Sequence, residues 1–512
     1  MELTEYIAPN GDVLLYTGEP DLKLLDELAS GSGDLWHSSL DQGFKNIFPE
    51  LVYQIAVFWY YLNDFDNLYR SVNWRINPNA FVVRKKVWEL TQGFSTEYDS
   101  KIMAALDFGF GLLRYRGGVP LYVSGLFKNE ANDILISSTD RYIFYKKNFK
   151  KEHAINMLLK RVLKNPSQEV NAFFKVQNKV LLVNNYPMVL PKGLNAIHGS
   201  PTVSVIIPTM HRQNYTLNLL RDYNSQKYPV NEVIVVDATP ENDRDENLYK
   251  SEDYNFELIV RWQESKGSCR ARNEAIDLCK GDYIIFADDD TRILPDFVEN
   301  HIKFIQTNKI DACNGMDIHA NSHTDDLEDL NSRLDQLGEK RWKAGAAQTF
   351  SNANACVKKE WVTKLIGNDI NFDGGYGEDT DYGMRIIKEG GLLFHNPFSA
   401  ILHLKPPTGG YRTWGLQSAV LGKKRKRQAW ELDSPVKFIK PVPSPTIVYG
   451  ILKHFKTEQV KEYKSKYFFL YLFNSSRRGS IFRLLNLPYK IVQFNRSMFY
   501  AKKLIQKGVR YK

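Results

Sequence analysis

The stretch Gly281–Asp290, GDYIIFADDD, constrains the fold more than any other part of the chain. Tyr283–Ala287 is a short apolar run, a pattern typical of a strand that is buried on both faces. The run ends in three carboxylates, Asp288, Asp289 and Asp290. Carboxylates that crowd together at the end of a buried strand repel one another and lose hydration, so we expect a cation to neutralise them.

A divalent cation is the simplest candidate for this role. Mg²⁺ and Mn²⁺ prefer oxygen ligands and take some of them from the phosphates of a substrate. Asp288 and Asp290 are separated by one residue, so their side chains share a face of an extended chain. The alternative is a solvated acidic turn, because Asp is common in turns.

The sequence before this stretch predicts an α/β domain with a largely parallel sheet, because strand and helix patterns alternate. Right-handed crossovers place the carboxyl ends of such strands at one edge, where ligands bind. We therefore expect Thr209, Asp237 and the three aspartates at this edge. The expected elements are a strand at Val203–Thr209, a helix at Asn214–Gln226, a strand at Glu232–Asp237, a helix at Arg270–Cys279 and the strand that ends at Asp288.

The length of 512 residues is enough for two or three domains. A segment with several prolines and glycines predicts a linker at 191–201, between an N-terminal domain (1–190) and the α/β domain (202–411). The four cysteines lack metal spacing, which favours reduced thiols. The N-terminus does not resemble a signal peptide, and no apolar run is long enough to span a bilayer, so we expect a cytoplasmic protein.

The remaining region, 412–512, has a helical pattern and is strongly basic. It contains 23 Lys and Arg against 4 Asp and Glu, so a formal charge of +19 lies in this tail and −10 in the rest of the chain. Such a tail suits an anionic surface. Lys423–Arg427 and the aromatic residues of Tyr467–Phe473 favour peripheral binding to the inner face of a plasma membrane. A solvated helical face and a nucleic-acid site are the alternatives, but no nucleic-acid recognition fold is evident.

Several motifs between Thr202 and Arg412 together resemble glycosyltransferase family 2, which has the GT-A fold. They are VSVIIPT, EVIVVDAT, KGSCRARNEAI, FADDDTRILPDF and GGYGEDTDYGMRI. Each motif is weak alone, but their order and spacing are specific. Ala238 and Thr239 depart from the small Gly/Ser-rich turn that is usual after the second strand.

The resemblance implies transfer of a sugar from a nucleotide-diphosphate donor, with Mn²⁺ or Mg²⁺ as cofactor. Asp288 and Asp290 would hold the metal, with His403 as a third ligand and His395 as the competing candidate. The residues expected to contact the nucleotide-sugar are Pro208, Thr209, Arg212, Asp237, Arg272, Asp288 and Asp289. The alternatives are a turn residue for Asp237 and a helix-surface residue paired with Glu274 or Asp277 for Arg272.

The resemblance also implies a catalytic base. An inverting transferase needs a carboxylate to remove the proton of the attacking hydroxyl. Asp379 would be this base, and Glu378 would position the acceptor, a surface polysaccharide or polyprenyl-linked glycan. Both residues also suit an acidic helix N-terminus. We expect Asp381 and Arg385 to form a structural pair at a spacing of four residues.

Short matches indicate an internal repeat. Asn79–Lys85 resembles Asn354–Glu360, and Asp107–Gly109 resembles Asp381–Gly383, each followed by a Gly-Gly pair. Ala104 and Ala105 stand where the later copy has the proposed base pair, and we expect no acidic strand end comparable with Asp288–Asp290 in the first copy. The first copy would then be a structural or acceptor-binding remnant.

Two rival functions remain. A nucleotidyltransferase also uses a nucleotide-binding sheet and paired acids, but it usually needs a glycine-rich loop after the first strand, and Thr209–Arg212 has no glycine. A scaffold subunit of a polysaccharide assembly complex is the non-enzymatic alternative. The sequence does not indicate the sugar, the base, the acceptor or the oligomeric state.

Overall fold

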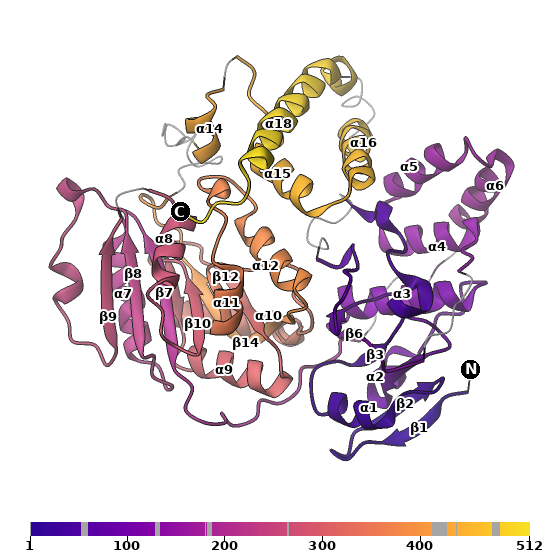
Figure 1. Ribbon diagram of the computed structural model, residues 1–512, viewed down its shortest axis with the longest axis horizontal. Helices are drawn as coiled ribbons and strands as arrows, with labels where there is room; N and C mark the ends of the chain where they lie inside the picture. Colours follow the sequence, from indigo (N-terminus) through magenta and orange to yellow (C-terminus); the bar gives the residue numbers. More distant parts are fainter. Residues whose placement is uncertain are drawn as a thin grey trace. The chain divides into compact units, whose positions relative to one another are not determined.

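The computed structural model describes residues 2–52, 60–128, 134–179, 181, 187–263, 266–411, 428–436, 438–473 and 482–512 (Figure 1). The chain forms two compact units. Unit 1 comprises Met1–Pro191, Lys343–Gln348 and Phe455–Tyr489, and unit 2 comprises Lys192–Trp342, Thr349–His454 and Lys490–Lys512. The four-part domain division expected from the sequence stays a prediction. The predicted basic cluster Lys423–Arg427 lies outside the described residues.

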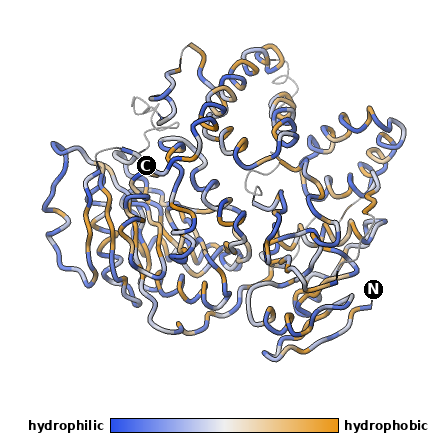
Figure 2. Tube along the Cα trace, viewed as in Figure 1, coloured by the Kyte–Doolittle hydropathy of each residue, from blue (hydrophilic) through white to orange (hydrophobic). Residues whose placement is uncertain are grey.

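Unit 2 contains an eight-stranded sheet within the described residues, in the order β11-β14-β12-β13-β10-β7-β8-β9. Its strands are β7 (Val203–Thr209), β8 (Glu232–Asp237), β9 (Glu257–Trp262), β10 (Tyr283–Ala287), β11 (Thr291–Ile293), β12 (Ala312–His319), β13 (Asn354–Lys358) and β14 (Leu393–His403). The predicted strands β7, β8 and β10 are parallel neighbours. β9, which was not predicted from the sequence, extends the sheet beyond β8. These central strands are largely apolar in Figure 2 and are buried.

Helices cover both the central and the outer strands. α8 packs on β7 and β8, α7 packs on β7 and β11, and α9 packs on β12 and β14. The helices of this sheet are α7 (Gln213–Asn224), α8 (Ser268–Ile276), α9 (Phe297–Asn308), α10 (Leu327–Leu337), α11 (Lys359–Leu365) and α12 (Glu378–Lys388). The two helices expected from the sequence are α7 and α8, with bounds shifted by one to three residues.

Strand direction brings the polar ends together. β7, β8, β9 and β10 run parallel, while β13 runs antiparallel to both β10 and β12. β12 therefore points the same way as β10, and β14 runs parallel to β12. The carboxyl ends of six strands consequently share one edge, which receives Thr209, Asp237, Asp288, His319 and His403.

The described part of unit 1 contains a six-stranded sheet in the order β1-β2-β5-β3-β6-β4. Its strands are β1 (Thr4–Ile7), β2 (Val13–Thr17), β3 (Leu35–His37), β4 (Arg70–Val72), β5 (Phe81–Arg84) and β6 (Pro120–Val123). Its helices are α1 (Leu22–Ala29), α2 (Lys85–Thr91), α3 (Lys101–Arg114), α4 (Ser138–Asn148), α5 (Lys151–Arg161) and α6 (Pro166–Gln177). The core gathers Leu35, Ile76, Phe81, Val83 and Leu112.

The C-terminal region is helical where it is described, with α14 (Ala429–Asp433), α15 (Pro445–His454), α16 (Thr457–Phe473) and α18 (Leu487–Lys507). Residues of α14, α15 and α18 share a core with Phe372 and Cys269 in unit 2. α16 belongs to unit 1 and packs on α5. Among the described residues, no helix has the length and apolarity that crossing a membrane requires.

Candidate active site

The three aspartates after β10 are paired with arginines. Arg212, just before α7, lies 3.1 Å from Asp289 and 2.6 Å from Asp290, and Arg272 of α8 contacts Asp288. Asp289 and Asp290 are 4% and 6% exposed. Burial raises the pKa of Asp289 to about 7, although Arg212 opposes this shift. The arginines therefore supply part of the neutralisation that the sequence analysis assigned to a metal alone.

His403, the last residue of β14, faces two carboxylates. Its Nε2 lies 3.4 Å from Asp290 Oδ1, and its Nδ1 lies 3.3 Å from Asp317 of β12. Burial lowers the pKa of His403, but hydrogen bonds to the two carboxylates outweigh burial and raise it to about 11. The same contacts with His403 and Arg212 hold the pKa of Asp290 below its usual range despite burial. A metal that binds at Nε2 has to displace a proton.

Two groups of side chains could hold a cation within the described residues. Asp288, Asp290 and His403 each offer a ligand atom, and these atoms lie within 4.8 Å of one another. Asp317, His319 and His403 form a second, more exposed group. Two carboxylates and one imidazole fit Mn²⁺, and a Mg²⁺ ion would rely mainly on the two carboxylates.

The predicted base pair lies at the start of α12. Gly377 precedes the helix at φ +105°, a conformation that favours glycine, and turns the chain so that Glu378 and Asp379 enter the site. Asn352 donates a hydrogen bond to Asp379 Oδ1. Burial raises the pKa of Asp379 to about 6; Arg272 lowers this pKa and Asp288 raises it further.

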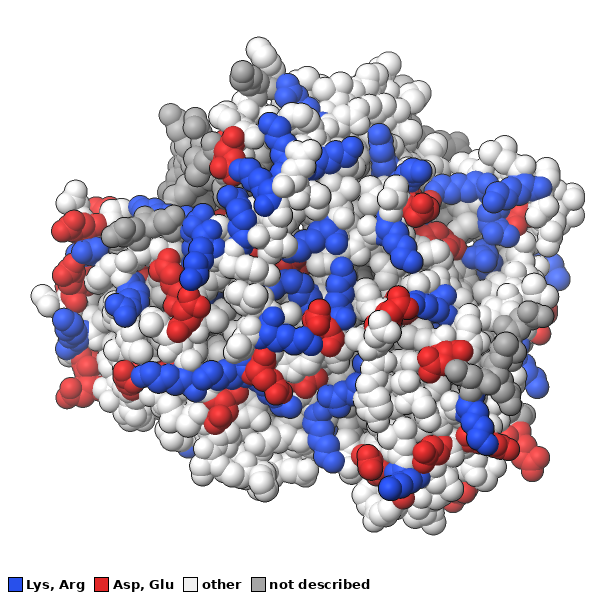
Figure 3. Space-filling view, viewed as in Figure 1, with Lys and Arg blue, Asp and Glu red and all other residues white. Residues whose placement is uncertain are grey.

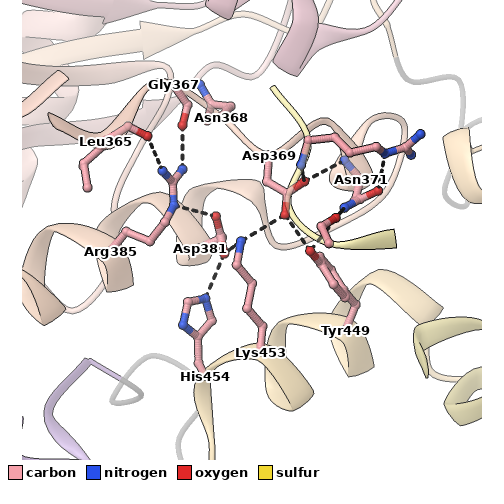
Figure 4. A network of polar contacts seen from close by, with 12 residues as sticks. Leu365, Gly367, Asn368, Asp369, Asn371, Asp381, Arg385, Tyr449, Lys453 and His454 are labelled. Atoms are coloured by element: carbon pink, nitrogen blue, oxygen red, sulfur yellow. Dashed lines mark hydrogen bonds and ion pairs between the residues drawn. The ribbon is translucent and has the colours of Figure 1, made fainter. Parts of the chain in front are cut away.

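A buried network fixes α12 two residues beyond Asp379 (Figure 4). Asp381 accepts hydrogen bonds from Arg385 Nε at 2.9 Å and His454 Nε2 at 2.8 Å, and it forms an ion pair with Lys453 at 2.6 Å. Lys453 also contacts Asp369 at 2.9 Å. Arg385, His454 and Lys453 hold the pKa of Asp381 well below its usual range. The expected Asp381–Arg385 pair is confirmed, and α15 adds the ammonium group of Lys453 and a hydrogen bond from His454 to it.

Most of the predicted site residues line one cavity of about 320 Å³ in unit 2. The aspartates and His403 lie on its wall together with Glu378 and Asp379. The predicted residues on the wall are Pro208, Arg212, Arg272, Asp288, Asp289, Asp290, Glu378, Asp379 and His403, and further wall residues are Ser268, Asp317, Ser351, Asn352 and Tyr411.

The part of the chain that forms this sheet resembles a known protein family. Residues 204–366, which include β7 to β13, match the model of Glycosyl transferase family 2. This region is similar to glycosyltransferase family 2. The match, together with the α/β sheet, confirms the predicted GT-A fold class and indicates a transferase.

Relatives of the family 2 domain come from archaea and bacteria. The chain is 28% identical over 210 residues to a Methanococcus voltae dolichyl N-acetyl-alpha-D-glucosaminyl phosphate 3-beta-D-2,3-diacetamido-2,3-dideoxy-beta-D-glucuronosyltransferase, and the match covers 38% of this chain and 64% of the relative. It is 29% identical over 108 residues to the Escherichia coli UDP-Glc:alpha-D-GlcNAc-diphosphoundecaprenol beta-1,3-glucosyltransferase WfaP, covering 21% of this chain and 43% of that one. The chain thus spans less than two thirds of either relative.

Two solved structures are also similar to parts of this chain, at lower sequence identity. The mannosyltransferase PcManGT from Pyrobaculum calidifontis, in complex with GDP-Man and Mn²⁺, is 17% identical with a TM-score of 0.37 and covers 69% of this chain and 97% of its own. S. aureus TarS 1–349 in complex with UDP-GlcNAc is 17% identical with a TM-score of 0.36, covering 59% and 81%.

Two predicted donor-site residues of the family 2 domain are engaged by the protein itself. Asp237 is fully buried, and its two oxygens accept hydrogen bonds from the Thr239 backbone and the Tyr249 hydroxyl, each at 2.8 Å. Thr209 is also buried and donates to Asp289 at 2.7 Å. In this arrangement Asp237 shapes the strand end and Thr209 orients an aspartate, and a direct nucleotide contact by either residue stays a prediction.

The structure separates the two histidine candidates. His395 pairs with Asn314 near the start of β14, eight residues before His403 and away from the edge. Asn352 and Asp317, which the sequence analysis did not select, both line the cavity. Asp317 and His319 form an alternating pair at the end of an extended run, which is a signal the sequence offered. Asn352 precedes β13 in a loop without a comparable signal.

Proposed function

We propose that this protein is an inverting, metal-dependent glycosyltransferase. It would move a sugar from a nucleotide-diphosphate donor to a hydroxyl of a surface-polysaccharide or lipid-linked glycan acceptor. The observation that carries this proposal is the shared cavity, whose wall contains the half-buried carboxylate of Asp379 together with the Asp288–Asp290–His403 group. The family match supplies the reaction class.

In this proposal the two arginines bind the diphosphate. Arg212 and Arg272 now pair with Asp288, Asp289 and Asp290. A cation held by Asp288, Asp290 and His403 would neutralise negative charge on the diphosphate as it departs. The carboxylates would then be paired with the cation, and the guanidinium groups would be available to donate hydrogen bonds to phosphate oxygens.

The acceptor hydroxyl would lie against Asp379. Its oxygen attacks the anomeric carbon, its proton passes to Asp379, and the bond from that carbon to the diphosphate oxygen breaks with its electron pair on the diphosphate. Because the attacking oxygen and the leaving group occupy opposite sides of the anomeric carbon, the configuration inverts. A raised pKa suits this role, since a stronger base accepts the proton more readily. Asn352 donates a hydrogen bond to Oδ1 of Asp379, which helps to orient this carboxylate in the cavity.

Polyprenyl-linked acceptors are the class we favour. The names of the two relatives, from Methanococcus voltae and Escherichia coli, include a dolichyl phosphate and a diphosphoundecaprenol. Such acceptors reside in a membrane, and α18 has the composition to approach one: five Lys or Arg, no Asp or Glu, and exposed Tyr489, Val492 and Phe499. In Figure 3 blue side chains outnumber red ones where α18 lies. Co-sedimentation with anionic vesicles should weaken in a Lys502→Glu/Lys503→Glu variant, and equal recovery would remove this part of the proposal.

Calorimetric titration tests the donor site directly. UDP, GDP and dTDP are titrated with and without Mn²⁺ into the full chain, into Asp290→Ala and into a matched control, Asp21→Ala, which alters a strand end in unit 1. We expect one nucleotide to bind only with Mn²⁺, to lose binding in Asp290→Ala and to keep it in Asp21→Ala. If none of the three nucleotides binds, the transferase proposal fails and a scaffold role replaces it.

A further inference from the structure

His403 lies on a strand whose neighbours bring a carboxylate to each side of it: Asp317 is part of β12, and Asp290 directly precedes β11. In the sheet, β14 lies between β11 and β12. His403 is opposite Thr291, the residue after Asp290, and also opposite His319 of β12. Asp317 is two residues before His319 and therefore points to the same face of the sheet. The imidazole thus projects between Asp290 on one side and Asp317 on the other.

Each ring nitrogen has its own carboxylate. Nε2 lies 3.4 Å from Asp290 Oδ1, and Nδ1 lies 3.3 Å from Asp317 Oδ2. A histidine binds a metal through a nitrogen that carries no proton, and the other nitrogen usually donates its N–H to a carboxylate or carbonyl. The partner of that N–H decides which nitrogen is left for the metal.

We propose that Asp317 is a positioning residue that keeps the proton of His403 on Nδ1, so that Nε2 faces the cation site formed with Asp288 and Asp290. This inference rests on the proposed metal-dependent function. Asp317 acts through His403 and does not touch the cation. Its effect is to hold the N–H at Nδ1 and the orientation of the ring, so that the proton a metal displaces is the one on Nε2.

The alternative is that Asp317 is itself a ligand in the Asp317–His319–His403 group. His319 is 69% exposed and Asp317 36%, whereas Asp290 is 9% exposed at its side chain. The group with Asp288 and Asp290 also lies on the cavity wall with Arg212 and Arg272, where a diphosphate could complete the coordination. One cation at Nε2 cannot also be held by the carboxylate at Nδ1, because the two nitrogens point in different directions. The geometry therefore favours the supporting role for Asp317.

Mn²⁺ binding, without nucleotide or acceptor, tests the inference. The signal of free Mn²⁺ in electron paramagnetic resonance gives the dissociation constant for the full-length wild type and four variants: Asp317→Ala, Asp317→Asn, His319→Gln and His403→Gln. We expect about 10–100-fold weaker binding in Asp317→Ala, because loss of a supporting carboxylate has effects of this size. Asp317→Asn retains an acceptor for the N–H and should recover most of the affinity, and His319→Gln should bind as the wild type does.

A spectroscopic readout separates positioning from ligation. Electron spin-echo modulation should show ¹⁴N coupling from imidazole to Mn²⁺ in the wild type, and His403→Gln should abolish it. Asp317→Ala should weaken this coupling at saturating Mn²⁺, while Asp317→Asn should restore it. Wild-type affinity and coupling in Asp317→Ala would overturn the inference alone, and so would weak binding in His319→Gln. Absence of Mn²⁺ binding by the wild type would overturn both this inference and the metal-dependent function.

Discussion

The sheets of unit 1 and unit 2 share four neighbouring strands but differ in what lies beside them. β2-β5-β3-β6 in unit 1 and β10-β13-β12-β14 in unit 2 have the same order, and each neighbouring pair has the same relative direction. Beside β2, unit 1 has one antiparallel strand, β1, whereas beside β10 unit 2 has the parallel strands β7, β8 and β9. Among the residues that the structure describes, unit 1 thus contains the part of the fold that carries the proposed base in unit 2, without counterparts of β7, β8 and β9.

Equivalent side chains support this correspondence. Asp34 accepts a hydrogen bond from the Val119 backbone at 2.9 Å, and Asp311 accepts one from the Leu392 backbone at 2.8 Å. Asp34 lies 3.9 Å from Arg84, and Asp311 lies 3.7 Å from Lys358. In both units the aspartate therefore fixes the start of a parallel strand and pairs with the last residue of its neighbour.

The correspondence extends into the helices after the sheets. Asp107 of α3 contacts Lys147 and Asn148 at the end of α4, each at 2.8 Å. In unit 2, Asp381 contacts Lys453 and His454 at the end of α15. Each pair of helical residues is followed by Phe-Lys in the sequence. The predicted repeat is thus longer than the short matches that suggested it, and common ancestry stays a prediction.

The strand ends explain where the chemistry resides. The register aligns Glu19 and Asp21, after β2, with Asp288 and Asp290, so the expectation of no comparable acidic strand end in the first copy needs correction. Asp21 caps α1 by accepting from Leu24 at 3.1 Å, and Glu19 lies 3.6 Å from Lys128 with both side chains 85% exposed. Acidic residues that are exposed or capping are not forced to share a cation. In unit 2 the aspartates are buried beside the end of β7 and the loop that follows it, and this burial creates the need for a shared cation.

The largest expected effect is on the base. Asp379→Asn should lower kcat by about 10²–10⁴-fold, the usual contribution of general base catalysis, and leave Mn²⁺-dependent nucleotide binding intact. Release of the nucleotide diphosphate from the donor identified by calorimetry measures the rate. A loss of less than tenfold would assign the base to another residue. In unit 1 the aligned position is Ala105, which has no such function to lose.

The next largest effect is on stability, and it compares Asp381 of α12 with Asp107 of α3, the two carboxylates that anchor these helices. Asp381→Ala leaves Arg385, Lys453 and His454 without their shared carboxylate, so we expect a loss of about 3–5 kcal/mol in the stability of unit 2. Asp107→Ala should cost unit 1 less, about 1–3 kcal/mol, because Lys147 keeps Glu97 at 2.8 Å. Urea titration followed by hydrogen exchange resolves the two units. The reverse order would show that the two anchors are not equivalent.

A smaller effect follows from the raised pKa of Asp379. A carboxyl whose pKa is about 6 in the folded state and about 4 in the unfolded state destabilises the fold above pH 6. This penalty fades as pH falls from 6 to 4, because both states become protonated. Asp379→Asn should therefore raise the free energy of unfolding by about 1–2 kcal/mol at pH 7 and have no effect below pH 4. Equal stability of variant and wild type at both pH values would contradict the raised pKa of Asp379.

The smallest expected effect is a loss of stability that should be equal in the two units. Asp34→Asn and Asp311→Asn keep an acceptor for the strand amide but lose the ion pair, so each should cost about 0.5–1 kcal/mol. Denaturation of both variants, resolved by unit as above, gives the two values. Costs that differ by more than about 1 kcal/mol would show that the alignment of Asp34 with Asp311 lacks energetic meaning.

Local patterns predicted the central part of the site well. The apolar runs of β7, β8 and β10 are buried on both faces, and such runs leave few alternatives. The strand β9 was not predicted, because it is only partly buried and its apolar pattern is not continuous. Contacts between distant segments were also missed, because Asn352 reaches Asp379 and Asp317 reaches His403 only through tertiary packing.

Hydrogen exchange of the full chain with and without nucleotide and Mn²⁺ tests the central claim most directly, namely that donor chemistry resides only in the sheet that has β7–β9. Slower exchange should appear in peptides that cover Pro208–Arg212, Asp288–Asp290 and His403–Tyr411. The matching strand end of unit 1, Gly18–Asp21, should exchange at an unchanged rate. Protection at Gly18–Asp21 instead of Asp288–Asp290 would contradict the claim.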